Sequence, residues 1–153
     1  MAAQLAPAEV DVVMERALAE LPVDEWRVVD TRRVGSRGPQ VDMVLVGPPG
    51  VFVVGFATPR DYGRAQAKLA MGLATAAEEV AALVAVRRDE VYPVLCVAGD
   101  DVVDGWTRGV SVCSASNLVE TIVFRRSLLT PDEVERVALE VGRAMRGGGK
   151  HRT

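Results

Sequence analysis

Residues 41–58, VDMVLVGPPGVFVVGFAT, decide the fold. The apolar runs 41–47 and 51–57 flank a Gly-Pro-Pro-Gly turn, so the stretch predicts a β-hairpin. Pro49 and Gly50 suit the two central positions of a type II turn, because proline presets φ at the first and glycine accepts positive φ at the second. Apolar residues on both faces of each strand indicate a central position in a sheet that is covered on both sides.

The flanking segments alternate between helical and strand patterns. Apolar residues at helical spacing, Pro7 at a first turn and the Thr130–Glu133 capping box mark helix starts and faces. The predicted helices are 8–21, 64–86, 114–124 and 129–145, and the further strands are 25–34, 91–99 and 109–115. The long helix between the hairpin and the next strand favours a parallel crossover, so we expect an α/β fold with a mixed central sheet flanked by helices.

The chain has 153 residues and a formal net charge of -3, which fits one domain over residues 1–146 and a disordered, basic, glycine-rich tail over 147–153. The negative charge argues against a dedicated nucleic-acid or anionic-membrane binder. Cys96 and Cys113 lie in apolar runs and are expected to be inert core thiols. His151 is the one histidine, which excludes His-based zinc sites and histidine base catalysis.

The first residues lack a positively charged start and a long apolar run, and no apolar stretch is long enough to span a bilayer. We therefore expect a cytoplasmic protein with no membrane partner.

Several segments together resemble the nuclease-related domain family, NERD. The matching pieces are the first helix with Glu9, VDMVLVGPPGVFVV, the alanine-rich helix with Gln66, YPVLCVAGDD and LLTPDEVERVALEVGRAM, which cover residues 8–146. The resemblance implies a restriction-endonuclease-like α-β-β-β-α-β core and a magnesium-dependent PD-(D/E)xK nuclease site.

The resemblance breaks at the catalytic positions. Asp42 stands where the family has its first carboxylate, but Gly55 and Ala57 occupy the acid and lysine positions of the acid-x-Lys triplet around Phe56. Residues i and i+2 of a strand share a face, so in the family the acid and the lysine converge on the metal and the attacking water. Glycine and alanine can neither hold a metal ion nor position the attacking water, which indicates a degenerate site.

Other residues leave alternatives open. Asp61, Gln66 and Lys68 follow the triplet and are candidates for relocated catalytic groups. Glu9 and Asp42 are weak candidates for a metal; alternatively, Asp42 caps a turn or accepts a bond from the loop before it. The arginines of the loop before Asp42 are candidates for phosphate binding: Arg32, Arg33 and Arg37.

These observations predict a catalytically degenerate NERD-like domain that serves as a protein-interaction or scaffold module, through a protein partner or self-association. The emptied cleft at Val53, Gly55 and Ala57 is expected to offer an apolar patch for that partner. No cofactor is expected. The alternatives are a metal-dependent nuclease, which would need Mg²⁺, and a nucleic-acid-binding module that does not cleave.

Overall fold

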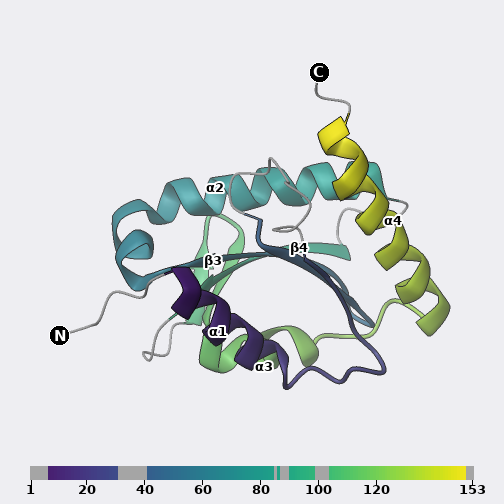
Figure 1. Cartoon of the computed structure of the whole chain (residues 1–153), viewed down its shortest axis with the longest axis horizontal. Helices are drawn as coiled ribbons and strands as arrows, with labels where there is room; N and C mark the ends of the chain where they lie inside the picture. Colours follow the sequence, from purple (N-terminus) through teal and green to yellow (C-terminus); the bar gives the residue numbers. More distant parts are fainter. Residues whose placement is uncertain (1–6, 31–40, 85, 87–89, 99–103, 151–153) are drawn as a thin grey trace.

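The computed structural model describes residues 7–30, 41–84, 86, 90–98 and 104–150; the side chains of 7–11, 30, 104 and 146–150 are outside this description. A mixed sheet of six strands lies between two layers of helices, with α2 and α4 on one face and α1 and α3 on the other (Figure 1). The elements in chain order are α1 (Pro7–Leu18), β1 (Arg27–Asp30), β2 (Met43–Gly47), β3 (Gly50–Ala57), α2 (Pro59–Leu83), β4 (Val91–Val97), β5 (Asp104–Thr107), β6 (Val110–Ser114), the 3-10 helix η3 (Ala115–Asn117), α3 (Leu118–Val123) and α4 (Pro131–Lys150).

The strand order in the sheet is β1-β2-β3-β4-β6-β5. β2 and β3 form the predicted antiparallel hairpin, and α2 carries the chain across to β4, which runs parallel to β3. The sequence therefore predicted the α/β class, the central hairpin and the parallel crossover correctly. β3 is buried along nearly all of its length, as its apolar residues on both faces indicated.

The hairpin turn differs by one residue from the prediction. Gly47 and Gly50 are paired across the hairpin, so Pro48 and Pro49 are its two central residues and Gly50 is the first residue of β3. Gly50 has a φ of 141°, and a Cβ there would overlap the carbonyl of Glu90. Glycine is thus required at this position by its backbone angle and by the close approach of Glu90, the residue before β4, although not in the turn position expected.

The β5–β6 hairpin includes a strand that the sequence pattern did not predict. Thr107 pairs with Val110 across a two-residue turn, in which Arg108 and Gly109 both have positive φ, 52° and 80°. Those angles are typical of a type I′ turn, the form that matches the twist of a hairpin. The strand was missed because its sequence, Asp-Gly-Trp-Thr, has too few apolar residues to show a period of two.

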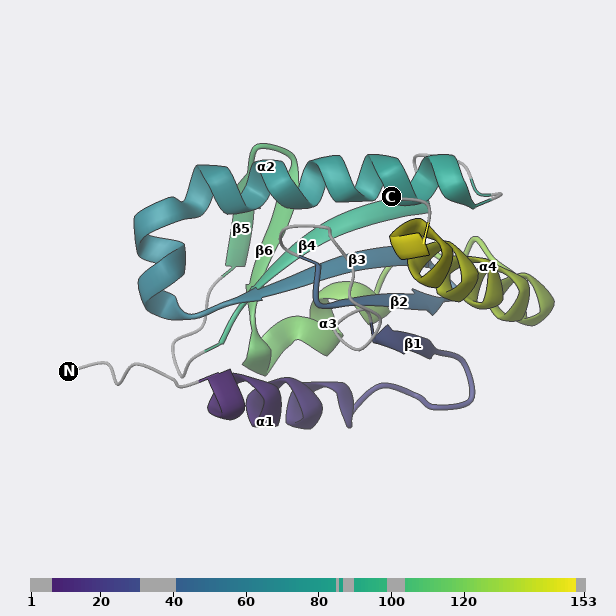
Figure 2. The ribbon, with the colours of Figure 1, turned by 45° about the horizontal axis from the view of Figure 1, so that its top comes forward.

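The helix boundaries also differ from the sequence prediction, most at the start of α2 and at the end of α4. α2 begins at Pro59, five residues before the expected 64, with the Thr58 hydroxyl accepting a hydrogen bond from the Asp61 N–H at 3.1 Å. The helix is kinked at Ala65 (φ -140°, ψ 34°), and Figure 2 shows the first turns bent away from the rest. α4 continues to Lys150, so the first four residues of the predicted disordered tail are helical; residues 151–153 lie outside the described part.

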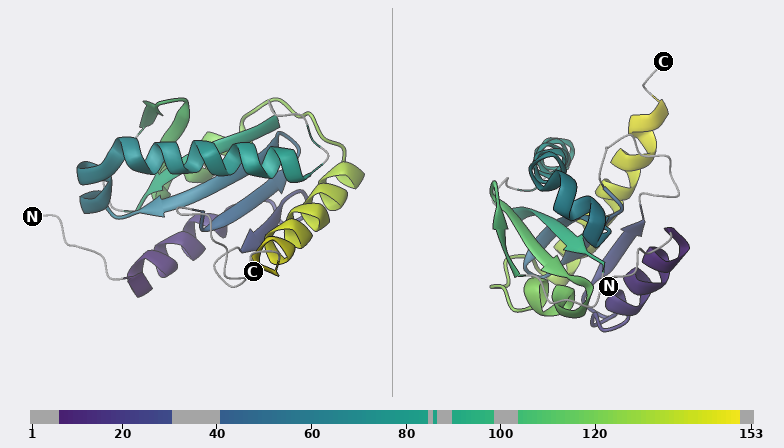
Figure 3. Two further views of the ribbon diagram at one scale, coloured as in Figure 1. Left: turned by 90° about the horizontal axis from the view of Figure 1, so that it is seen from above. Right: turned by 90° about the vertical axis from the view of Figure 1, so that its left-hand side faces the viewer.

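The start of α4 confirms the predicted capping box. The Thr130 N–H donates to the Glu133 carboxylate at 2.8 Å, and the Glu133 N–H donates to the Thr130 hydroxyl at 3.2 Å. These reciprocal bonds satisfy two backbone donors that a helix start otherwise leaves unpaired. From this start α4 runs beside β1 and β2 (Figure 3).

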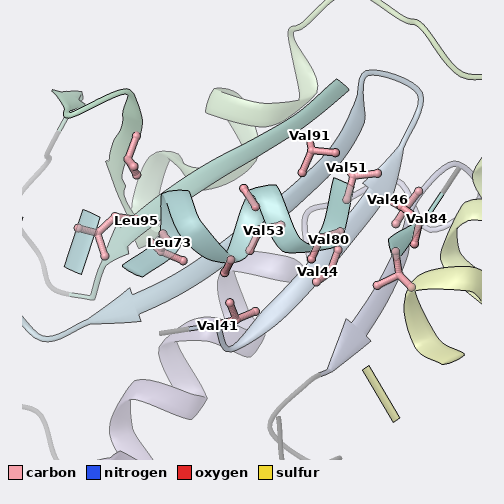
Figure 4. Packing of buried hydrophobic residues seen from close by; sticks show 14 of the residues in the cluster. Val41, Val44, Val46, Val51, Val53, Leu73, Val80, Val84, Val91 and Leu95 are labelled. Carbon is pink, nitrogen blue, oxygen red and sulfur yellow. The ribbon is translucent and has the colours of Figure 1, made fainter. Parts of the chain in front are cut away.

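The sheet separates two hydrophobic cores. The core under α2 and α4 consists of valine, alanine and leucine among its buried members, including Val44, Val53, Leu73 and Val80 (Figure 4). The core under α1 and α3 contains larger and more varied side chains, which include Met14, Trp26, Phe52, Cys96 and Ile122.

Candidate functional site

Asp42 is built into the end of the β2–β3 ladder. Its backbone N–H donates to the Val54 carbonyl at 2.9 Å, and its carboxylate Oδ2 accepts a hydrogen bond from the Phe56 N–H at 2.7 Å. The last registered pair is Met43 with Val54, so the carboxylate serves as the acceptor for the next donor of β3 after the strand pairing ends. The half-buried Asp42 thus has a structural bond to β3. The predicted bond from the loop before it involves residues 31–40, which lie outside the described part.

The positions that the NERD pattern assigns to the acid and the lysine, Gly55 and Ala57, face α2. Val53 and Ala57 belong to the core beneath α2 and α4, and Gly55, which lies between them on the same face of the strand, is also buried. Val53 is 0% exposed and Ala57 is 5% exposed. The expectation of an apolar patch open to a partner is therefore wrong, because side chains such as Ala70 and Leu73 of α2 fill the space.

The candidates for relocated chemistry lie on α2. Asp61 is in the first turn, before the kink at Ala65, and Gln66 and Lys68 follow the kink. All three are exposed, while Ala57 is buried. Across the residues that the structure describes, no group of three or more His, Cys, Asp or Glu side chains is arranged to hold a metal ion.

The remaining predicted site residues are not tested by the structure. Glu9 lies in α1, but its side chain is outside the described part. The proposed phosphate-binding arginines all fall within the undescribed segment 31–40: Arg32, Arg33 and Arg37.

A cluster that the sequence did not indicate lies at the other end of β3. Phe52 stacks on Tyr92 with ring centroids 4.9 Å apart and contacts Trp26 at 5.7 Å. The guanidinium of Arg125 lies over Tyr92, 4.7 Å from its centroid, and 5.7 Å from that of Phe52. A guanidinium held close to two rings in this way has a cation–π contact that restricts its position. The pair Arg125-Arg126 was visible in the sequence, but no local pattern predicts which aromatic rings it would meet.

The two cysteines confirm the expectation of core thiols. Cys96 and Cys113 are paired positions on the parallel strands β4 and β6, and both are free and fully buried. A hydrogen bond with Cys113, together with burial, raises the pKa of the Cys96 thiol well above its usual value. The protonated form is a poor nucleophile and a poor metal ligand, which agrees with an inert role.

No protein-family model, curated protein or solved structure matches the chain. The likeness to NERD thus stays a prediction carried by the residues quoted above. Among the described residues, no helix is both long enough and apolar enough to cross a membrane.

Proposed function

We propose that the protein is a NERD-like domain without nuclease activity that works as a protein-interaction or scaffold module. The observation that carries the proposal is the 2.7 Å hydrogen bond from the Phe56 N–H to the carboxylate of Asp42. This bond gives the one retained carboxylate of the family pattern a role in the backbone of the sheet, at the point where the family places its metal.

The surroundings of Asp42 support the same proposal. Mg²⁺ requires near-octahedral oxygen ligands and is usually held by carboxylates together with substrate phosphates. The strand positions that would add a second carboxylate and a lysine are Gly55 and Ala57, which pack beneath α2. Loss of one preorganised electrostatic group costs roughly 10²- to 10³-fold in rate, and here two are replaced.

An assay of plasmid nicking with Mg²⁺ and with Mn²⁺ tests the proposal. We expect no nicking above the background of a matched Asp42→Ala preparation, and no saturable metal binding by calorimetry. Metal-dependent nicking that disappears in Asp42→Ala would show that the domain is a nuclease after all. The same comparison in Lys68→Ala and Asp61→Ala identifies any relocated groups.

The cellular setting belongs to the proposal as well. Cys96 and Cys113 are free at neighbouring positions of the sheet, and thiols remain reduced in the cytoplasm. This supports the expected cytoplasmic location. A protein partner would bind a surface other than the one at Val53, Gly55 and Ala57, which α2 covers.

A further inference from the structure

The segment that joins α3 to α4, residues 124–128, displays an unusual surface. Phe124 is 83% exposed, the highest value for a large apolar side chain among the described residues, and Leu128 is 42% exposed. Arg126 between them is also exposed, and Arg125 is half-buried. Aromatic and arginine side chains are the types that contribute most to protein–protein binding energy.

The segment is held in place at both ends. The N–H groups of Leu128 and Leu129 both donate to the carbonyl of Pro48, at 2.7 and 2.8 Å. Near its start, Arg125 is stacked over Tyr92 and Phe52. The backbone that carries the exposed side chains of Phe124 and Leu128 is therefore anchored. This lowers the entropic cost of ordering the segment when a partner binds.

Arg125 has an unsatisfied polar atom. Its Nε is buried and has no hydrogen-bond partner, while its terminal nitrogens are not among the buried unpartnered atoms. None of the carboxylates that the structure describes forms an ion pair with it. A buried donor without an acceptor costs stability, and an apolar side chain could cover Tyr92 without that cost. The buried Nε is out of reach of a partner, but the two terminal nitrogens of Arg125 reach the surface without a bond to any described residue, so they can donate to an acceptor outside the chain.

The chemistry of the segment points to one kind of acceptor. A guanidinium suits a carboxylate, which can accept two parallel N–H bonds from it. The flanking apolar side chains favour a protein segment over a nucleic acid, as does the net charge of -3. We propose that residues 124–128 dock a partner protein segment in which a carboxylate stands beside an apolar side chain. This names the partner chemistry of the proposed interaction module and rests on that function.

The test uses N-acetylphenylalanine, which carries a free carboxylate beside an aromatic ring, and its uncharged amide analogue. Binding is followed on the full chain by ¹⁵N NMR, through the Nε–H of Arg125 and the backbone amides of Phe124 and Leu128. We expect the carboxylate probe to shift these signals in a saturable way, and the amide analogue to bind at least about tenfold more weakly.

Arg125→Met should weaken binding of the carboxylate probe by about tenfold or more. The matched substitution of the neighbouring residue, Arg126→Met, should weaken binding by less than about threefold. Melting curves check that both variants are folded; should Arg125→Met unfold, Arg125→Lys keeps the charge without the planar fork and is expected to bind several-fold more weakly than the parent.

Three results would overturn the docking site. The amide analogue could bind as well as the acid, Arg125→Met could leave binding unchanged, or a decathymidylate could shift the same signals at lower concentration than the carboxylate probe. Each of these is independent of nicking at Asp42, because Asp42 meets β3 at Phe56 and Arg125 meets it at Phe52. Failure of the docking site and failure of the proposed function are thus separable.

Discussion

The two faces of the sheet are built from different chemistry. The face under α2 and α4 is filled by valine, alanine and leucine, and it includes Ala57 of the broken triplet. The face under α1 and α3 holds Trp26 and Phe52, and the ring stack continues through Tyr92 to Arg125. The comparison teaches that the face on which the NERD pattern would place catalytic groups is a plain aliphatic core, while a cation in contact with aromatic rings lies on the other face.

The strongest test of this comparison is to introduce the two residues of the NERD pattern into β3. Gly55→Glu with Ala57→Lys would bury two charges beneath α2, where Ala57 is 5% exposed. We expect a loss of more than about 5 kcal/mol in unfolding free energy, because buried charges without solvation are strongly destabilising. Urea denaturation measures it, with the exposed Lys68→Ala as a control that should change little. A stable double variant that binds Mn²⁺ would mean that the α2 face is still an open site.

A substitution on the opposite face tests the aromatic stack. Phe52→Ala is expected to cost about 3–5 kcal/mol, because it removes a fully buried ring that contacts Trp26 and Tyr92. Val53→Ala, one residue along on the aliphatic face, should cost roughly 2 kcal/mol, from the lost buried carbon atoms and the cavity. Equal losses in the two variants, measured by chemical denaturation, would remove the energetic distinction between the faces.

The hydrogen bond between the Phe56 N–H and Asp42, at the end of the β2–β3 pairing, should contribute less to the unfolding free energy than the Phe52 ring. Asp42→Ala leaves the Phe56 N–H without its acceptor, at a cost of about 1.5–3 kcal/mol for a bond to a charged group. Asp42→Asn keeps an oxygen acceptor and should cost less. Hydrogen exchange of the Phe56 amide reports the bond directly, and it should become faster in Asp42→Ala. Unchanged exchange would show that the carboxylate is not the acceptor in solution.

The smallest effect is expected at the start of α4, on the aliphatic side. Thr130→Ala removes the N-cap acceptor and should cost about 1 kcal/mol. The Thr130 backbone N–H, and then its hydroxyl, lower the pKa of Glu133 in the folded protein. A lowered folded pKa stabilises the protein above the unfolded pKa of glutamate, and this stability is lost as the pH falls through the folded pKa.

Glu133→Gln should therefore show a smaller loss of stability on acidification than the parent, in melting temperatures compared between neutral pH and the acidic range. Glu135→Gln provides a control on the same helix. If both variants follow the pH dependence of the parent, the capping carboxylate does not contribute to it.

The sequence predicted those parts of the fold that local chemistry determines. The apolar hairpin and the Thr130–Glu133 capping box depend on neighbouring residues, and both are present. The parallel crossover, also present, was predicted from the long helix between the two strands. β5 was missed because its pairing with β6, rather than any apolar period, makes it a strand. The turn was misplaced by one residue because the need for glycine at Gly50 comes partly from Glu90, a residue far along the chain.

The places of the candidate residues in the sheet were predictable, but their contacts were not. Asp42, Gly55 and Ala57 were identified by position, and the i, i+2 rule placed Gly55 and Ala57 on one face of β3. The sequence could not show that α2 would cover that face, nor that Asp42 would bond to Phe56. The contact of Arg125 with Tyr92 and Phe52 could not be predicted, because these rings lie on strands far from Arg125 in the sequence.

The carbonyl of Pro48 has a consequence for how the chain reaches this structure. It joins the tip of an early hairpin to Leu128 and Leu129, which come much later in the sequence. Closing so long a loop is slow relative to forming a hairpin. We therefore expect β2 and β3 to pair before Leu128 and Leu129 bond to Pro48. During synthesis the hairpin would leave the ribosome well before residues 128 and 129. During that interval the Pro48 carbonyl would lack the two N–H donors that it bonds in the folded chain.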